Sequence, residues 1–114
     1  MTNKAKNLSV DICVIGAGAG GLSVAAGASQ MGASVALVES GKMGGDCLNY
    51  GCVPSKAMLA AGHAAEAVRQ GGRFGVEADG PTVDAGRVYG HIGNVIKAIE
   101  PNDSIERFEG MGVT

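Results

Sequence analysis

The sequence predicts an α/β fold in which a βαβ unit is followed by helices. The short apolar run at residues 10–15 is typical of a strand buried on both faces of a parallel sheet, and residues 34–39 form a second apolar, strand-like run. Between them, residues 20–31 carry small and apolar side chains in a helix-compatible pattern, and Gly32 follows as a natural C-terminal stop. A crossover from one parallel strand to the next is almost always right-handed. We therefore expect one right-handed βαβ unit at the start of the domain.

The remainder of the chain is predicted to be mainly helical. An alanine-rich pattern indicates a helix from about residue 55 to 70. Asp84 can cap a further helix, whose apolar stripe consists of Val88, Ile92, Val95, Ile96 and Ile99. Asp103 and Glu106 have capping-box spacing for a last short helix that ends at Gly110. We expect the residues after that helix to start another strand.

Length and charge narrow the class of protein. With 114 residues the chain is one domain at most, and we assign residues 1–9 to a polar N-terminal arm and 10–114 to the domain. A net charge of -2 favours neither nucleic acid nor an anionic membrane as a partner. The first residues are too polar for a secretion signal or a membrane span. We expect a cytoplasmic protein, where cysteines seldom form structural bridges.

A dinucleotide-binding fingerprint lies between the first strand and the first helix. Gly16, Gly18 and Gly21 form G-x-G-x-x-G, with Ala19 at the predicted helix start. The first glycine permits a tight turn, the second lets the backbone approach a diphosphate, and the third allows close packing of the helix. Glu39, eighteen residues after Gly21, ends the second strand, where an acid accepts hydrogen bonds from a ribose. The alternative is a tight connection and a solvated acid. The fingerprint does not distinguish FAD from NAD.

The pair Cys47 and Cys52 is the second candidate site. In a regular helix, Cα atoms five residues apart are about 8.6 Å from each other, whereas a disulfide needs less than about 7 Å. A bridge therefore requires an irregular turn, which Gly51 and Pro54 favour. So small a ring stabilises a fold little, and redox exchange is the better reason for it. Cys52 is expected near the N-terminus of the following helix, with Lys56 one turn later. Both features can lower the pKa of a thiol toward a reactive thiolate.

The cysteines and histidines allow other interpretations. The pair could be two free thiols, or part of a zinc site with His63, but a second ligand pair is absent, so we predict no metal site. Cys13 lies mid-strand, where an inert buried thiol is expected. His63 and His91 have no motif around them and are predicted to lie on helix surfaces or in the core.

The sequence resembles the pyridine nucleotide-disulfide oxidoreductases in three features. These are the glycine fingerprint, the strand that ends in an acid, and the segment GGDCLNYGCVPSK at 44–56. The resemblance covers almost the whole chain and implies a partial Rossmann-like FAD-binding domain. It also implies that the three glycines cradle the FAD diphosphate, that Glu39 holds the adenosine ribose, and that Gly45 and Asp46 line the flavin. By the same resemblance, Cys52 is the charge-transfer thiol, Cys47 meets the substrate, and Lys56 lies beside flavin N5.

The resemblance implies an activity and a longer enzyme. Electrons pass between NAD(P)H, FAD and a redox-active disulfide, with a small disulfide, dithiol or metal ion as substrate and a homodimer as the full-length form. Asp46, where many members have Thr, and Tyr50 favour a dihydrolipoamide dehydrogenase-like or mercuric reductase-like branch. Because no second fingerprint is present, we expect an N-terminal segment that does not turn over alone. The alternatives are a non-catalytic dinucleotide-binding module and a purely structural fragment.

Overall fold

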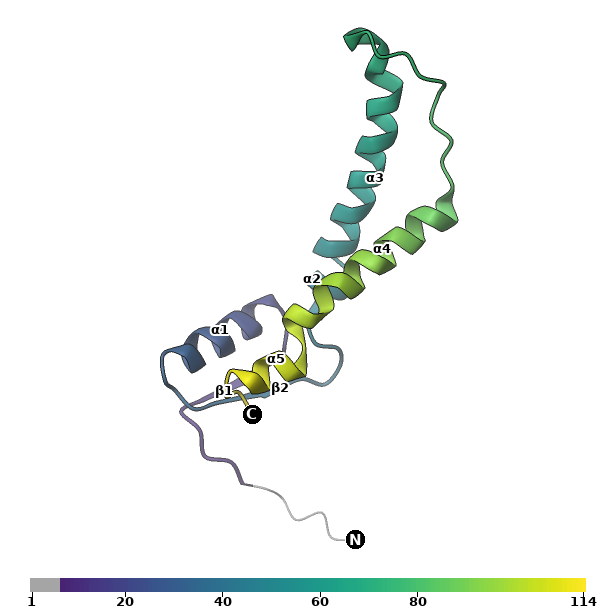
Figure 1. Cartoon of the computed structure of the whole chain (residues 1–114). Coiled ribbons are helices and arrows are strands. Elements are labelled where there is room, and N and C mark those ends of the chain that lie inside the picture. The colour runs from purple at the N-terminus through teal and green to yellow at the C-terminus, as the bar shows by residue number, and fades with distance from the viewer. Residues whose placement is uncertain (1–6) are drawn as a thin grey trace. The chain divides into compact units, whose positions relative to one another are not determined.

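A computed structural model describes residues 7–114, which divide into two compact units. The first unit comprises the chain up to Gly44 together with Asp103–Thr114, and the second comprises Gly45–Asn102. Of the predicted N-terminal arm, residues 1–6 lie outside the described residues. Figure 1 labels the helices and strands of both units.

The first unit contains the predicted βαβ element. Strand β1 (Ile12–Ile15), helix α1 (Ala19–Gln30) and strand β2 (Val35–Val38) follow one another, and the strands pair in parallel with Ile12 opposite Val35. Gly32 has a φ of 90° just after α1, which is the left-handed conformation expected at a helix end. The α/β fold class and the crossover element are confirmed.

The chain returns to this sheet at its last residues. Helix α5 (Ile105–Gly110) precedes Val113, which forms a parallel bridge with Val35. The backbone N–H of Thr114 donates to Val35 O at 2.9 Å, and Leu37 N–H donates to Thr114 O at 2.8 Å. A third strand therefore starts beside β2, as the sequence predicts.

One face of the sheet carries the core of the first unit. Side chains from β1, β2, α1 and α5 meet there, and the buried members of the cluster are Val14, Ala17, Leu22, Ala25, Val35, Phe108 and Val113. On the opposite face Cys13 is exposed, Ile15 is 87% exposed and Val38 is 54% exposed. The predicted burial of both strand faces is therefore wrong for Cys13 and Ile15 of β1, although Ala36, which pairs with Cys13 on the same face, is buried. The physical reason is that α1 and α5 both pack on the face of Val14.

The second unit is helical. It contains α2 (Gly45–Asn49), α3 (Cys52–Gln70), the 3-10 turn η1 (Gly71–Phe74) and α4 (Ala85–Ile99). Asp84 caps α4 as predicted, accepting from Arg87 N–H at 3.1 Å. Figure 1 shows α3 and α4 close together near the start of α3 and splayed apart toward the connection between them.

A second 3-10 turn, η2 (Glu100–Asp103), leads from α4 to α5. The N-cap of α5 is Ser104, whose hydroxyl accepts from Arg107 N–H at 3.2 Å. The predicted cap at Asp103 is therefore one residue too early, because η2 takes up that residue.

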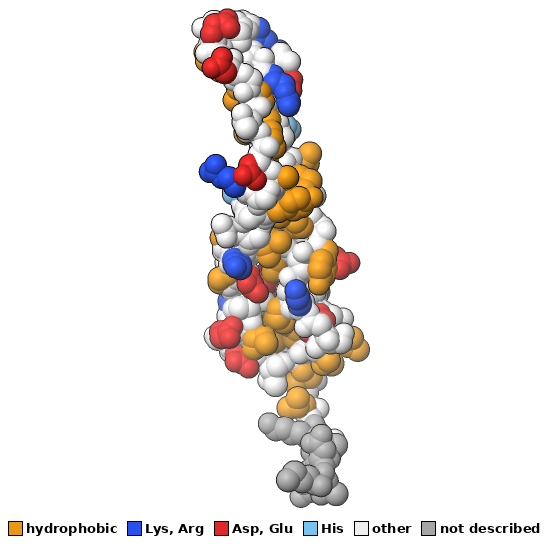
Figure 2. Space-filling view, turned by 90° about the vertical axis from the view of Figure 1, so that its right-hand side faces the viewer, with side chains coloured by type: hydrophobic (Ala, Val, Ile, Leu, Met, Phe, Trp, Pro, Cys, Tyr) orange, Lys and Arg blue, Asp and Glu red, His pale blue; other side chains and the backbone are white. Residues whose placement is uncertain are grey.

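Charged and apolar side chains share the surface. Figure 2 shows hydrophobic side chains at the surface between separated acidic and basic ones. Within residues 7–114, none of the helices has the length and apolar character needed to cross a membrane.

Candidate functional site

The glycine turn between β1 and α1 has the geometry that its sequence predicts. Gly16 has a φ of 103°, a conformation that other residues rarely adopt, and its N–H donates to Val38 O at 2.7 Å. A Cβ placed on Gly21 would lie 1.8 Å from Gly16 O, so only glycine lets the first turn of α1 approach the strand this closely. A Cβ on Gly18 would meet nothing within 4 Å, so the turn is open there.

The start of α1 is suited to an anion. Gly18 is its N-cap, and no side chain in the described part of the chain caps this helix end. Backbone N–H groups at a helix N-terminus and the helix dipole both attract a phosphate. Ala19 is exposed at the first position of the helix. The residues present therefore fit a dinucleotide diphosphate.

The carboxylate of Glu39 is directly joined to the glycine turn. Its Oε2 atom accepts from Ala17 N–H at 2.6 Å, and its Oε1 atom accepts from Gly41 N–H at 2.7 Å. The hydrogen bond from Ala17, and then the one from Gly41, lowers the pKa of Glu39 below its ordinary value. The predicted acid thus lies beside the fingerprint and is held as a carboxylate. Its link to Ala17 was not predicted, because only the folded turn brings that N–H to the end of β2.

The cysteine segment forms the irregular turn that the spacing requires. Helix α2 ends at Asn49, and α3 begins at Cys52. Between them Asp46 O accepts from Tyr50 N–H at 2.9 Å and from Gly51 N–H at 2.6 Å. The second bond spans five residues instead of four, so the chain makes a wider turn than a regular helix.

The two thiols interact across this turn. Both are free, with Cys47 half-buried and Cys52 exposed. A side-chain hydrogen bond with Cys52 raises the pKa of Cys47, removal from water raises it further, and the charge of Lys56 opposes the shift. The predicted position of Cys52 at a helix start is confirmed. Cys47 is thus influenced by a second thiol and by a cation, which are groups that take part in thiol–disulfide exchange.

The remaining predicted site residues flank these groups. Gly45 opens α2 with a φ of 58°, and the side chains of Asp46 and Lys56 are exposed. These residues and the thiols belong to the second unit, whereas the glycine turn and Glu39 belong to the first. Within residues 7–114 no group of three or more His, Cys, Asp or Glu residues could hold a metal ion.

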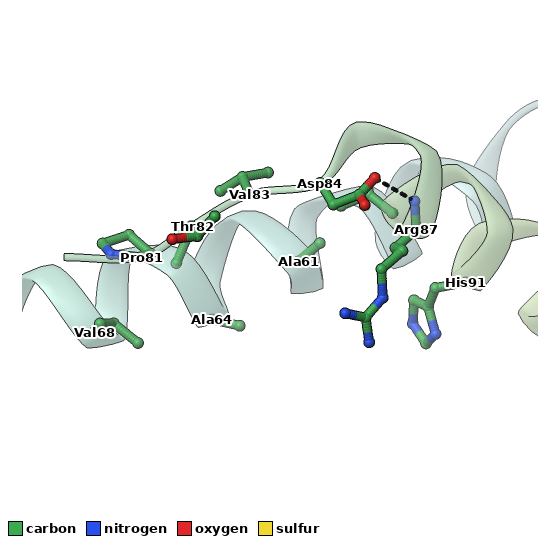
Figure 3. A pocket seen from close by; sticks show the side chains of 11 residues that line it. Ala61, Ala64, Val68, Pro81, Thr82, Val83, Asp84, Arg87 and His91 are labelled. Carbon is green, nitrogen blue, oxygen red and sulfur yellow. Dashed lines mark hydrogen bonds between the residues drawn. The ribbon is translucent and has the colours of Figure 1, made fainter. Parts of the chain in front are cut away.

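A separate cleft lies between α3 and α4 in the second unit. Figure 3 shows Ala61, Ala64 and Val68 of α3 along it, with Arg87 and His91 extending from α4. His91 and His63 are both exposed on their helices, as predicted. Asp84, which caps α4, lines the same cleft, so acidic and basic groups are both present there.

In the first unit, a parallel βαβ element with a glycine turn and an acid at the end of β2 has the features of a dinucleotide-binding domain, and the second unit carries a pair of thiols. The sequence profile of the family described as pyridine nucleotide-disulphide oxidoreductase matches residues 10–110. The chain belongs to this family.

Curated relatives agree with the family. The chain is 38% identical over 92 residues to a dihydrolipoyl dehydrogenase of Geobacillus stearothermophilus, covering 81% of this chain and 20% of the relative. It is 50% identical over 74 residues to a dihydrolipoyl dehydrogenase of Halobacterium salinarum, covering 65% and 15%. A mercuric reductase of Streptomyces lividans is 47% identical over 75 residues, covering 65% and 16%. The chain thus spans about a fifth of the length of the first of these relatives.

Proposed function

We propose that this chain belongs to an FAD-dependent disulfide oxidoreductase that uses NAD(P)H and exchanges electrons through Cys47 and Cys52. The observation that carries the proposal is the irregular turn after Asp46, which separates the half-buried Cys47 of α2 from Cys52 at the start of α3. The family match and the open glycine turn support it.

The chain's own residues have distinct tasks in this proposal. The backbone of Gly16, Gly18, Ala19 and Gly21 would hold the FAD diphosphate, and Glu39 would accept from the adenosine ribose while it keeps the turn in place. Gly45, Asp46 and Lys56 would line the flavin. When bound, FAD supplies two-electron redox chemistry that the side chains lack.

The exchange between the cysteine pair and the substrate balances in bonds and electrons without any further reactant. With a disulfide substrate, the Cys47 thiolate attacks one sulfur and the first substrate thiolate leaves. The Cys52 thiolate then attacks Sγ of Cys47, which forms the Cys47–Cys52 disulfide and releases the second substrate thiolate. The substrate gains two electrons, and the cysteine pair loses two. A dithiol substrate is oxidised by the same steps in reverse.

We propose a small disulfide or dithiol as the substrate, with the dihydrolipoyl group as the first candidate because two of the relatives described above are dihydrolipoyl dehydrogenases. A mercuric ion is the second candidate, because a mercuric reductase is 47% identical over part of the chain. We propose a homodimer as the working form. Turnover of the whole protein with lipoamide and with mercuric ion, measured by NAD(P)H absorbance, would separate the two substrates.

Visible absorbance of the whole purified protein tests the flavin and thiol roles. We expect a flavin spectrum and, after two-electron reduction, a long-wavelength band that requires Cys52. The variant Cys52→Ser should lose the band, whereas Cys47→Ser should keep it. A colourless protein would favour a binding module or a structural segment, and a band that survives in Cys52→Ser would contradict the role of Cys52.

A further inference from the structure

Asn49 lies between the two cysteines in the sequence, and its side chain forms a hydrogen bond within α2. Its Nδ2 atom donates to Gly45 O at 2.9 Å, which joins the last residue of α2 to the first. Asn49 is half-buried, so this hydrogen bond is partly shielded from water. Cys47 is the middle residue of the segment that this bond spans.

A second closure lies immediately beyond it. Gly51 N–H donates to Asp46 O at 2.6 Å, and a Cβ on Gly51 would lie 3.1 Å from the same oxygen. The segments spanned by these two hydrogen bonds, 45–49 and 46–51, overlap, and both contain Cys47. Because α3 starts at the next residue, the position of Cys52 relative to Cys47 depends on this short segment.

We propose that Asn49 is a positioning residue that holds the turn in the geometry at which Cys47 and Cys52 meet. The proposal rests on the proposed function, in which these two thiols form a reversible disulfide. Asn49 touches neither substrate nor electron acceptor in this role, and it acts by raising the effective concentration of one thiol at the other.

The chemistry of the side chain explains why an amide is needed. Asparagine supplies an N–H donor at the reach of the Gly45 carbonyl, whereas an ionised aspartate of the same shape can only accept and would repel that oxygen. Alanine has the higher helix propensity but no donor. The backbone beside Cys47 is held by the same segment, because Gly51 N–H donates to Asp46 O and α3 begins at Cys52.

The test is a redox equilibrium of the full chain in glutathione buffers. The reaction converts two cysteine thiols and one glutathione disulfide into the Cys47–Cys52 disulfide and two glutathione molecules. Cys13→Ser is included in every protein, because Cys13 is an exposed third thiol. The fraction oxidised is read by maleimide labelling and mass spectrometry.

The variants are Asn49→Ala, Asn49→Asp and Asn49→Gln, with Asn94→Ala as the matched control on the exposed surface of α4. We expect Asn49→Ala and Asn49→Asp to lower the equilibrium constant for disulfide formation about threefold to tenfold, the size of one net hydrogen bond. Tenfold corresponds to about 30 mV toward less negative potential. Asn49→Gln, which keeps the donor, should recover part of the loss, and Asn94→Ala should match the parent.

Two other results would overturn the inference in distinguishable ways. If the parent forms the disulfide and the Asn49 variants match Asn94→Ala, the positioning role is wrong while the proposed function stands. If the parent pair forms no disulfide with glutathione, the proposed function fails, and the inference fails with it. A purely structural role would lower the urea midpoint and leave the equilibrium constant of the folded variants unchanged. If Asn49→Ala does not fold, the equilibrium constants of Asn49→Gln and the parent still test the inference.

Discussion

The Oε2 atom of Glu39 accepts a hydrogen bond from the backbone N–H of Ala17 at 2.6 Å, across 22 residues of sequence. The other carboxylate oxygen holds Gly41 N–H at 2.7 Å, so one side chain ties the loop after β2 to the glycine turn after β1. An acid at the end of β2 therefore shapes the proposed dinucleotide site before any ribose reaches it.

The first prediction concerns the variant Glu39→Gln. The amide offers one acceptor oxygen, and its NH2 group faces the N–H that loses its partner, so we expect lower stability than the parent at pH 7. The folded pKa of Glu39 is lowered, so its contribution is present above the ordinary glutamate pKa and is lost as the pH falls through the lowered value. Urea unfolding at several pH values should show the two proteins converging in acid.

Amide NMR provides an independent check of the same contact. The Ala17 and Gly41 resonances of the parent should titrate together with an apparent pKa below about 4.3, the ordinary value for glutamate. They should not titrate in Glu39→Gln. The contact would be contradicted if the Ala17 and Gly41 resonances of the parent did not titrate with Glu39. It would also be contradicted if the difference in stability between the parent and Glu39→Gln grew in acid.

The second prediction compares two adjacent glycines of α1. In Gly21→Ala the new Cβ would lie 1.8 Å from Gly16 O, so the helix must move away from the turn. We expect a loss of about 1–3 kcal/mol in the free energy of unfolding, as for other overpacked sites. Gly20→Ala is the control: its Cβ meets nothing within 4 Å, and alanine should stabilise the helix by about 0.5–1 kcal/mol. Equal effects in urea denaturation would show that Gly21 has no packing role.

The local elements were predictable because their signals are local. The glycine turn, the C-terminal stop at Gly32 and the cap at Asp84 each depend on a few neighbouring residues. The need for an irregular turn between Cys47 and Cys52 followed from helix geometry alone, and the helix break before Cys52 meets it.

Features that depend on distant segments were not predictable. The apolar run around Cys13 predicts a buried strand, but only the placement of α1 and α5 decides which face is covered. The contact between Glu39 and Ala17 depends on how the turn folds. Asp103 and Ser104 are both good caps, and the turn η2 decides between them.

The choice between those two caps yields the third prediction. Ser104→Ala removes the acceptor for Arg107 N–H and should cost about 1 kcal/mol of unfolding free energy. Asp103→Ala should cost clearly less, because the Asp103 side chain does not cap α5. Chemical denaturation of both variants is sufficient, and the reverse order of stability would restore Asp103 as the cap.

The last prediction concerns the reactivity of Cys47. Its pKa is raised first of all by the side-chain hydrogen bond with Cys52, so removing that partner should lower the pKa. Only the thiolate reacts with iodoacetamide, and at pH 8 the variant Cys52→Ala should therefore alkylate faster at Cys47 than the parent does. Residue-resolved mass spectrometry gives the rate, and the exposed Cys13 in the same molecule serves as the reference.

The pH dependence separates this effect from a change in access. If the thiol interaction is responsible, the alkylation profile of Cys47 should shift to lower pH in Cys52→Ala while the plateau rate at high pH stays close to that of the parent. A higher plateau with an unchanged midpoint would mean that the substitution merely exposes Cys47. In that case the titrations of Cys47 and Cys52 would not be coupled.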